Sequence, residues 1–262
     1  MRKILAVILA AVVVLTVGCS SATGKLEKIK SEGQMVVYTD PNFAPFEFSV
    51  GSGIRGVDVE IGKAIAAELG VKATFEEAKF DSILMSIKSG KCDISISGFT
   101  ITDERKKSVD FSDPYINSVQ YLILPEGSKI ASMEDLAGKI VGVAQGYTGE
   151  FLMDDETGKG GVLESENVEI KVYNSAMEAA LDLKLDRLDA IVMDEYVAKN
   201  VVAKYTDIET KELCYKNGDL AAEEYGVAVA KGNQELLDII NGVIAKLKAE
   251  NKIQEWVVEF SS

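Results

Sequence analysis

Short apolar runs alternate with amphipathic stretches along this chain, and the alternation limits the possible folds more than any other feature. In the first of two such runs, the expected strands are 35–40, 72–78 and 92–98. The expected helices are 57–70 and a second one that Asp81 can cap and that Ser89-Gly90 ends. The first of these helices has apolar side chains in steps of four, at Val57, Ile61, Ile65 and Leu69. A β-α-β-α-β order predicts a largely parallel sheet that is covered on both faces.

A second run of the same kind begins near residue 119 and predicts a second α/β lobe. Its expected elements are strands at 119–126, 139–146, 169–173 and 190–194, a short helix opened by Ser132, and a helix at 175–189 with a capping-box pattern. The tail at 233–260 predicts one or two amphipathic helices that pack back on the first lobe. A chain of 262 residues is long enough for two lobes of about 100–130 residues each.

Charge and composition exclude several classes of function. The chain has 28 basic and 42 acidic side chains, a formal charge of −14, so it lacks the basic excess that binds nucleic acid. This acidity can also serve solubility alone. The chain has no histidine, which excludes Ser-His-Asp and Cys-His nucleophile pairs and histidine-bound zinc. An enzyme based on carboxylates or lysine remains open.

Residues 1–18 predict an export signal rather than a part of the fold. A basic start is followed by an apolar run at 4–17 that is too short to span a bilayer comfortably. The position of Cys19 resembles a bacterial lipoprotein signal, in which the cysteine is acylated and becomes the mature N-terminus, although Thr16 stands where leucine is usual. The alternative is a simple cleaved signal peptide. We expect 19–32 to be a polar tether.

Two further cysteines, Cys92 and Cys214, remain after Cys19. In an oxidising compartment such a pair could form a disulfide, but their wide separation in sequence does not establish that they are close in space. The alternative is that both act as separate, buried small hydrophobes.

In open α/β lobes, ligand-binding groups gather at the carboxyl ends of the strands. Three such strand ends lie in the first lobe, at 40–48, at Phe80-Asp81 and at 97–106. Two more lie in the second lobe, at 145–149 and 194–196. Hydrogen-bond donors and acceptors are therefore divided between the two lobes.

The stretch SGFTITDERK at 97–106 predicts an anion site. The backbone N–H groups of Gly98, Phe99 and Thr100, the Thr100 hydroxyl and the Arg105 guanidinium can converge where a strand ends and a helix capped by Thr102 begins. Because one base is involved and no GxxxxGK(S/T) loop is present, a carboxylate is a better ligand than a phosphate. The alternative is a surface ion pair of Arg105 with Asp103, Glu104 or Asp110.

Asp194 predicts a cation site in the opposite lobe. It follows the apolar strand AIVM and precedes a helix, so its carboxylate is expected to project into the same cleft. A ligand with a carboxylate and an ammonium group on one carbon would satisfy both lobes, and an amino acid is such a ligand. Asp194 can also be the N-cap of the following helix, and the two roles are compatible.

Several segments, in order and at the expected spacing, resemble the bacterial extracellular solute-binding proteins, family 3, of polar amino-acid ABC transporters. The resemblance runs from about residue 33 to the end. It is carried by TDPNFAPFEF, GVDVEIGKAIAAELG, ISGFTITDERKKSVDFSDPY, EDLAGKIVGVAQGYTGE, DRLDAIVMDE and YGVAVAKGN. The third of these segments is the most specific.

The resemblance implies a set of ligand-binding residues. Ser97, Gly98, Thr100 and Arg105 would hold the α-carboxylate, and Thr148 would add a further donor. In the same resemblance, Asp194 would receive the α-ammonium group.

Other positions would surround the ligand side chain. Phe43 and Phe80 match aromatic positions that flank the ligand, although core packing is the alternative for both, and Asp40 matches a nearby polar position. The second-lobe loop departs from the frequent Gly-Thr-Thr of the family, because Tyr147 stands between Gly146 and Thr148. The resemblance therefore does not imply the shape of the pocket on that side.

The resemblance also implies the fold: a two-lobed, periplasmic-binding-protein-like type II α/β fold whose hinge consists of two crossovers, near 115–119 and 222–225. The first lobe would comprise 33–117 and 223–262, and the second 118–222. Ligand would favour closure of the lobes, and a membrane permease would recognise the closed form. We expect a monomer without cofactor or metal.

Charge near the expected pocket is the one indication of the ligand side chain. Asp40, Glu47 and Asp81 lie near the expected pocket with few bases, which favours a cationic or neutral polar amino acid, although Glu47 can instead be structural. Two other functions remain open. A dehydratase for prephenate or arogenate shares this fold and would use Glu47 or Asp194 as its acid. A ligand-sensing receptor subunit usually adds a transmembrane or kinase segment.

Overall fold

The computed structural model describes residues 24–261. The expected signal peptide at 1–18 and the expected lipidation site at Cys19 lie outside these residues. Among the residues that the model describes, no helix is both long enough and apolar enough to cross a membrane.

The first lobe is built on a mixed five-stranded sheet. Its strands, in spatial order, are β5 (Lys72–Glu77), β1 (Gln34–Thr39), β6 (Ile94–Ser95), β14 (Ala228–Ala230) and β7 (Val109–Phe111). The first three strands are parallel, as the β-α-β-α-β order predicts, and β14 runs antiparallel to both of its neighbours. A small antiparallel sheet of β2 (Asn42–Phe43), β3 (Glu47–Val50) and β4 (Gly53–Arg55) lies beside it.

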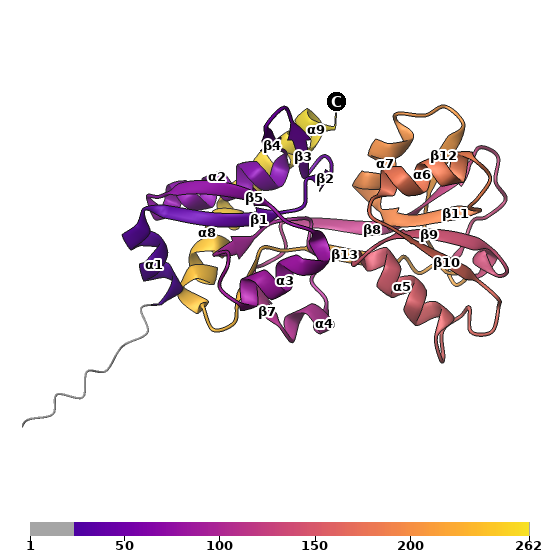
Figure 1. Ribbon diagram of the computed structural model, residues 1–262, viewed down its shortest axis with the longest axis horizontal. Coiled ribbons are helices and arrows are strands. Elements are labelled where there is room, and N and C mark those ends of the chain that lie inside the picture. Colours follow the sequence, from indigo (N-terminus) through magenta and orange to yellow (C-terminus); the bar gives the residue numbers. More distant parts are fainter. Residues whose placement is uncertain (1–23, 262) are drawn as a thin grey trace, which may run out of the picture.

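Helices pack against the first sheet and against one another, and all but one of them bury apolar side chains. They are α1 (Lys25–Glu32), α2 (Val57–Leu69), α3 (Phe80–Lys88), α4 (Asp103–Lys106), α8 (Gln234–Ala249) and α9 (Lys252–Phe260). In α2, Ile61 and Ile65 are fully buried, in agreement with the predicted stripe. The C-terminal helices α8 and α9 both pack against α2, which confirms that the tail returns to the first lobe (Figure 1).

The second lobe is built on another mixed sheet, seen on the right in Figure 1. Its strands, in spatial order, are β10 (Glu169–Tyr173), β9 (Ile140–Ala144), β11 (Ala190–Asp194), β8 (Ile116–Pro125) and β12 (Ile208–Glu212). Its helices are the 3₁₀ turn η1 (Met133–Leu136), α5 (Thr148–Thr157), α6 (Ala176–Lys184) and α7 (Glu195–Val202). The helix α6 is shorter than the predicted 175–189, because Asp186 has a positive φ of 56° that ends the helical conformation.

Two neighbouring strands connect the sheets. The long strand β8 runs from the first lobe into the second (Figure 1), and β13 (Ala222–Tyr225) pairs with it antiparallel, from Ala222 opposite Val119 to Tyr225 opposite Ile116. The two expected crossovers fall on this pair of strands. The chain therefore has the two-lobed periplasmic-binding type of α/β fold.

The expectation of a free tether at 19–32 is wrong for its last residues. The segment from Lys25 to Glu32 forms α1, and Ile29 is fully buried against the first lobe. Lys25 Nζ lies 2.9 Å from Asp93 Oδ1 in a largely buried ion pair. A polar composition suggested a tether, but Ile29, the partly buried Leu26 and this ion pair dock the helix on the first lobe.

Asp81 is not the cap of the following helix. The helix α3 begins at Phe80, one residue earlier, and Asp81 is exposed in its first turn. The carboxylate of Asp40 accepts a hydrogen bond from the Phe80 N–H at 3.1 Å. A residue from the end of β1 thus satisfies the start of α3, and a long-range contact of this kind leaves no local sequence signal.

Cys92 and Cys214 are both free thiols and form no disulfide within residues 24–261. Cys92 is buried, and burial raises the pKa of its thiol to about 12. Cys214 is partly exposed, so the description of two buried hydrophobes holds for Cys92 alone.

Candidate ligand-binding site

Arg105 is held in a buried position at the boundary between the lobes. Its helix α4 starts as predicted, because the Thr102 hydroxyl accepts a hydrogen bond from the Arg105 N–H at 3.1 Å. Arg105 is only 6% exposed, and its guanidinium carbon lies 5.3 Å from the ring centre of Phe80 and 5.4 Å from that of Phe99. Burial lowers the pKa of the guanidinium to about 10, against an ordinary value of 12.5, so the group remains cationic at neutral pH.

The alternative surface ion pairs of Arg105 are absent from the described chain. The three acids that could have paired with it bind neighbouring lysines instead: Asp103 with Lys106, Glu104 with Lys107, and Asp110 with Lys231. The guanidinium donates to the Thr100 carbonyl at 2.9 Å and to the Gly146 carbonyl at 3.1 Å. Because arginine carries five N–H donors, these two bonds leave donors for a carboxylate.

The lobes touch each other directly beside Arg105. Gly146, which accepts from Arg105, belongs to the second lobe and has a positive φ of 77°, a conformation that favours glycine. The Thr148 hydroxyl, also from the second lobe, donates to the Thr100 hydroxyl at 2.7 Å. Three predicted site residues, Arg105, Thr100 and Thr148, therefore form one cluster with Gly146.

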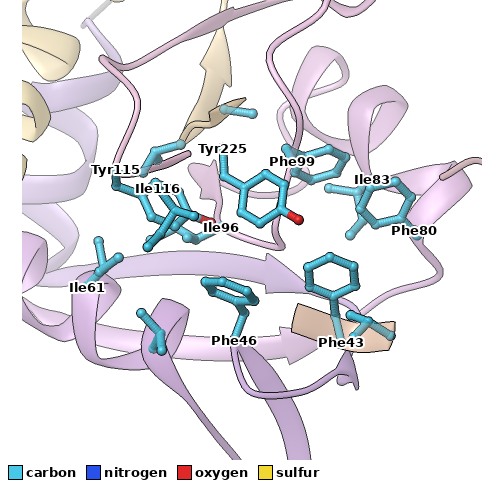
Figure 2. Packing of buried hydrophobic residues seen from close by; sticks show 14 of the residues in the cluster. Phe43, Phe46, Ile61, Phe80, Ile83, Ile96, Phe99, Tyr115, Ile116 and Tyr225 are labelled. Atoms are coloured by element: carbon cyan, nitrogen blue, oxygen red, sulfur yellow. The ribbon is translucent and has the colours of Figure 1, made fainter. Parts of the chain in front are cut away.

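Aromatic rings line the rest of this boundary. Figure 2 shows the rings of Phe43, Phe46 and Tyr225 gathered near Phe80 and Phe99. The Phe43 ring lies on Gly98, whose φ is 55°, and a β-carbon added there would lie 2.2 Å from the ring. Glycine at 98 is thus required both by its backbone conformation and by the position of the ring.

Tyr147 extends from the second lobe between two rings of the first. Its ring centre lies 4.5 Å from that of Phe80 and 5.6 Å from that of Phe43. Tyr147 is 4% exposed, and its hydroxyl is buried without a hydrogen-bond partner among residues 24–261. The sequence departure at this position therefore lies at the centre of the contact between the lobes.

Two buried carboxyl groups lie behind the predicted anion site. The Ser97 hydroxyl donates to Glu47 at 2.7 Å, and the Gly98 N–H donates to Asp58 at 2.8 Å. Burial, and then the neighbouring Asp58 charge, raise the pKa of Glu47 well above its ordinary value, and burial raises the pKa of Asp58 to about 6. Glu47 is thus structural, the second of the two interpretations of its sequence, and Asp58 was not predicted at all.

A second acidic pair lies on the side of Asp194. The Tyr225 hydroxyl lies 3.1 Å from Asp194 Oδ1 and 3.2 Å from Glu223 Oε1, and the Thr100 hydroxyl donates to Glu223 at 2.8 Å. Burial raises the pKa of Glu223 well above its ordinary value, with the Asp194 charge as the next cause. Asp194 is the N-cap residue of α7 by position, but its side chain makes no capping bond.

Asp58→Asn is expected to stabilise the protein more at pH 8 than at pH 5. An acid whose pKa is raised to about 6 in the folded state stabilises that state below its unfolded value near 3.8, and this contribution is lost as the pH rises through 6. Asparagine mimics the neutral form and keeps an acceptor for Gly98. The melting temperature difference from wild type should grow by several degrees between the two pH values, since 1 kcal/mol corresponds to about 2–4 °C in a chain of this size. Asp113→Asn, at an exposed carboxylate, is the control, and equal shifts for both variants would contradict the assignment.

Two cavities lie beside Phe80, the ring that Tyr147 contacts. A cavity of about 750 Å³ opens beside Arg105 and is lined by residues of both lobes, among them Phe80, Gly146 and Thr148. A second cavity, of about 380 Å³, lies beside Asp40 and is lined by Phe80 and by Gln145 of the second lobe. A small molecule held between the lobes can therefore reach groups from both.

Most of the site residues predicted from the sequence lie at the boundary between the lobes. Arg105, Thr100, Thr148, Phe43, Phe80 and Tyr147 meet there, whereas the predicted donors Ser97 and Gly98 are bound to Glu47 and Asp58. Glu223 and Tyr225 were missed. The sequence AEEY has no apolar alternation that could have indicated them, and only the structure shows that these two side chains share one buried face.

The fold and the cleft define a two-lobed solute-binding protein of the periplasmic-binding type. The model of the bacterial extracellular solute-binding proteins, family 3, matches residues 35–260. The chain belongs to this family.

Individual relatives agree with this membership. The L-cystine-binding protein TcyJ of Escherichia coli (strain K12) is 34% identical over 235 residues, which are 88% of this chain and 84% of that protein. The arginine-binding extracellular protein ArtP of Bacillus subtilis (strain 168) is 30% identical over 258 residues, which are 97% of this chain and 96% of that protein. Both relatives are named as binding proteins for amino acids.

A solved structure shows the same fold. The amino acid ABC transporter substrate-binding protein AbpA from Streptococcus pneumoniae Canada MDR_19A, bound to L-arginine, superposes with a TM-score of 0.81 at 34% identity. The comparison covers 90% of this chain and 97% of that chain. Both sequence relatives and this structural neighbour therefore place the chain among amino-acid-binding, substrate-binding proteins.

Proposed function

We propose that this protein captures a free L-amino acid in the cleft between its lobes and delivers it to an ABC transporter permease. The observation that carries the proposal is the buried guanidinium of Arg105, which donates to carbonyls of both lobes and keeps donors for a carboxylate. The ligand carboxylate binds Arg105, Thr100 and Thr148, with Ser97 and Gly98 behind them. Its ammonium group binds Asp194, and Phe43, Phe80, Tyr147 and Asp40 surround its side chain.

The charge balance of the cleft favours a cationic or neutral polar ligand. Arg105 is the one buried cation among residues 24–261. Five buried acids surround the cleft, namely Asp40, Glu47, Asp58, Asp194 and Glu223. An acidic ligand side chain would lie among these groups without a second cation to pair with it. Relatives named for arginine and cystine binding support the same preference.

Closure of the lobes is the step that the permease recognises in this proposal. Each lobe holds one end of the zwitterion, so bound ligand favours the closed arrangement by contacts that separated lobes cannot make. The paired strands β8 and β13 form the hinge, with lobe 1 at 33–117 and 223–262 and lobe 2 at 118–222. We further propose that the chain is extracytoplasmic, monomeric and anchored by lipid on Cys19.

A thermal-shift screen of residues 20–262 against the twenty amino acids, ornithine, citrulline and cystine tests the proposal. Ligand that binds the native state alone stabilises it by about 2.7 kcal/mol at a hundredfold excess over Kd. In a chain of this size that is a rise of roughly 5–10 °C in the melting temperature. We expect the largest shifts with cationic or neutral polar amino acids, and recovery of the ligand unchanged by mass spectrometry. No shift with any compound would reject an amino-acid ligand, and chemical conversion of the ligand would reject a binding protein.

A further inference from the structure

The second-lobe loop supplies a residue that neither the carboxylate site nor the ammonium site requires. Tyr147 lies at the start of α5 with an extended backbone (φ −80°, ψ 161°), and its N–H donates to the Ala144 carbonyl at 3.1 Å. This geometry directs the ring across the boundary and into the first lobe, where it contacts Phe80 and Phe43. The side chain is therefore placed by the turn that precedes α5.

The ring of Tyr147 leaves no space for another group between itself and the ring of Phe80. A side chain inserted between two ring faces needs about 7 Å, which is twice the contact distance of roughly 3.5 Å between carbon atoms. The centres of Phe80 and Tyr147 are 4.5 Å apart, and the planes are tilted by 59°. The edge contact with Phe43, at 5.6 Å and 72°, closes the other side. The space between Phe43 and Phe80 is thus filled by the protein itself.

The polar end of Tyr147 does not hold the ring in place. Its hydroxyl is buried and has no hydrogen-bond partner in the described part of the chain. Burial, followed by the charges of Asp40, Glu47 and Asp194, raises the pKa of this hydroxyl well above its ordinary value, so it stays neutral among acidic neighbours. An unsatisfied buried hydroxyl is unfavourable, and a movement that exposes it or gives it a partner regains a hydrogen bond.

We propose that Tyr147 is the specificity-determining residue of this cleft, because its ring occupies the place between Phe43 and Phe80 that a ligand side chain would enter. Amino acids with short side chains bind at Arg105 and Asp194 and leave the ring where it is. Amino acids with long side chains bind after the ring has been displaced, and their affinity is lowered by the contacts that this movement breaks. The inference rests on the proposed function and, within its cationic and neutral polar ligands, favours those with the shorter side chains.

Calorimetric titration of wild type and Tyr147→Thr with L-alanine and L-arginine as probes tests this role. The substitution removes the ring and keeps a residue suited to the start of a helix. We expect the preference for L-arginine over L-alanine, as the ratio of their Kd values, to rise at least tenfold. A ratio that is unchanged or falls would overturn the proposal, because the ring would then be neutral or would attract the long side chain.

Two matched variants separate the ring from its surroundings. Tyr147→Phe keeps the ring and removes the hydroxyl, so its ratio should remain within about threefold of wild type. Tyr196→Thr removes another tyrosine of the second lobe, whose ring centre lies 5.2 Å from that of Phe46. Because this ring lies against Phe46 rather than Phe80, the substitution should also leave the ratio unchanged. A tenfold change in either variant would assign the effect to something other than the Tyr147 ring.

A measurement without ligand keeps this inference distinct from the proposed function. If neither probe binds wild type, the amino-acid assignment fails, and small-angle X-ray scattering then decides the role of Tyr147. Because the ring bridges the lobes, Tyr147→Thr should have a larger radius of gyration than wild type and Tyr147→Phe. Equal radii for all three proteins would reject the ring as a bridge between Phe43 and Phe80.

Discussion

Arg105→Ala is expected to weaken binding of the amino acid found in the thermal-shift screen by about 2–5 kcal/mol, or roughly 30- to 5,000-fold. The guanidinium is almost fully buried and lies between the carbonyls of Thr100 and Gly146. Its removal leaves a ligand carboxylate in the closed cleft without a cation, and a buried unpaired charge is costly. Calorimetric titration measures the loss directly.

The controls for this substitution address folding and charge. Arg187→Ala removes an exposed arginine that pairs with Asp182 and should leave binding unchanged. Arg105→Lys retains the charge but not the planar pair of donors, so its loss should lie between those of wild type and the alanine variant. Circular dichroism confirms that each variant is folded. A loss below tenfold in a folded Arg105→Ala variant would remove Arg105 from the ligand site.

Asp194→Asn is expected to weaken the same ligand by about 2–4 kcal/mol, or roughly 30- to 1,000-fold. Asp194 is 2% exposed at the end of β11 and accepts a hydrogen bond from the Tyr225 hydroxyl at 3.1 Å. Asparagine has nearly the same shape and can still accept that bond, so the substitution mainly removes the charge that faces the ligand ammonium.

An analogue of the ligand identifies the partner of Asp194. The 2-hydroxy acid with the same side chain lacks the ammonium group, so wild type should discriminate strongly against it and Asp194→Asn should do so much less. Glu195→Gln neutralises the next residue, a partly exposed acid that pairs with Lys199, and serves as the control. Equal discrimination by wild type and Asp194→Asn would show that another group receives the ammonium.

The parts of the site that follow from local rules could be predicted from the sequence. Thr102 begins a helix through its own side chain, and Arg105 lies one turn later, so both are fixed by a few neighbouring residues. The strand that ends in Asp194 is a continuous apolar run, which indicates burial in a sheet and places the acid at its end. Each of these inferences depends on spacing within a single element.

The partners of these residues could not be predicted, because they come from distant parts of the chain. Asp58 accepts from Gly98 across 40 residues, and Glu223 accepts from Thr100 across 123 residues. The start of α3 is satisfied by Asp40 rather than by Asp81 for the same reason. Local patterns indicate that a donor is present, but tertiary packing decides which acceptor reaches it.

The place of β14 has a consequence for the order in which the protein can fold. Strands β8 to β12 follow one another along the chain, so the second sheet can assemble as soon as that segment emerges. The first sheet instead remains divided between β6 and β7 until β14 arrives to pair with both. The helices α8 and α9, which cover α2, come later still. During N-to-C synthesis the first lobe therefore stays incomplete until nearly the whole chain has been made. This delay agrees with the extracytoplasmic location proposed above, for which the chain would cross a membrane in an extended form before it folds.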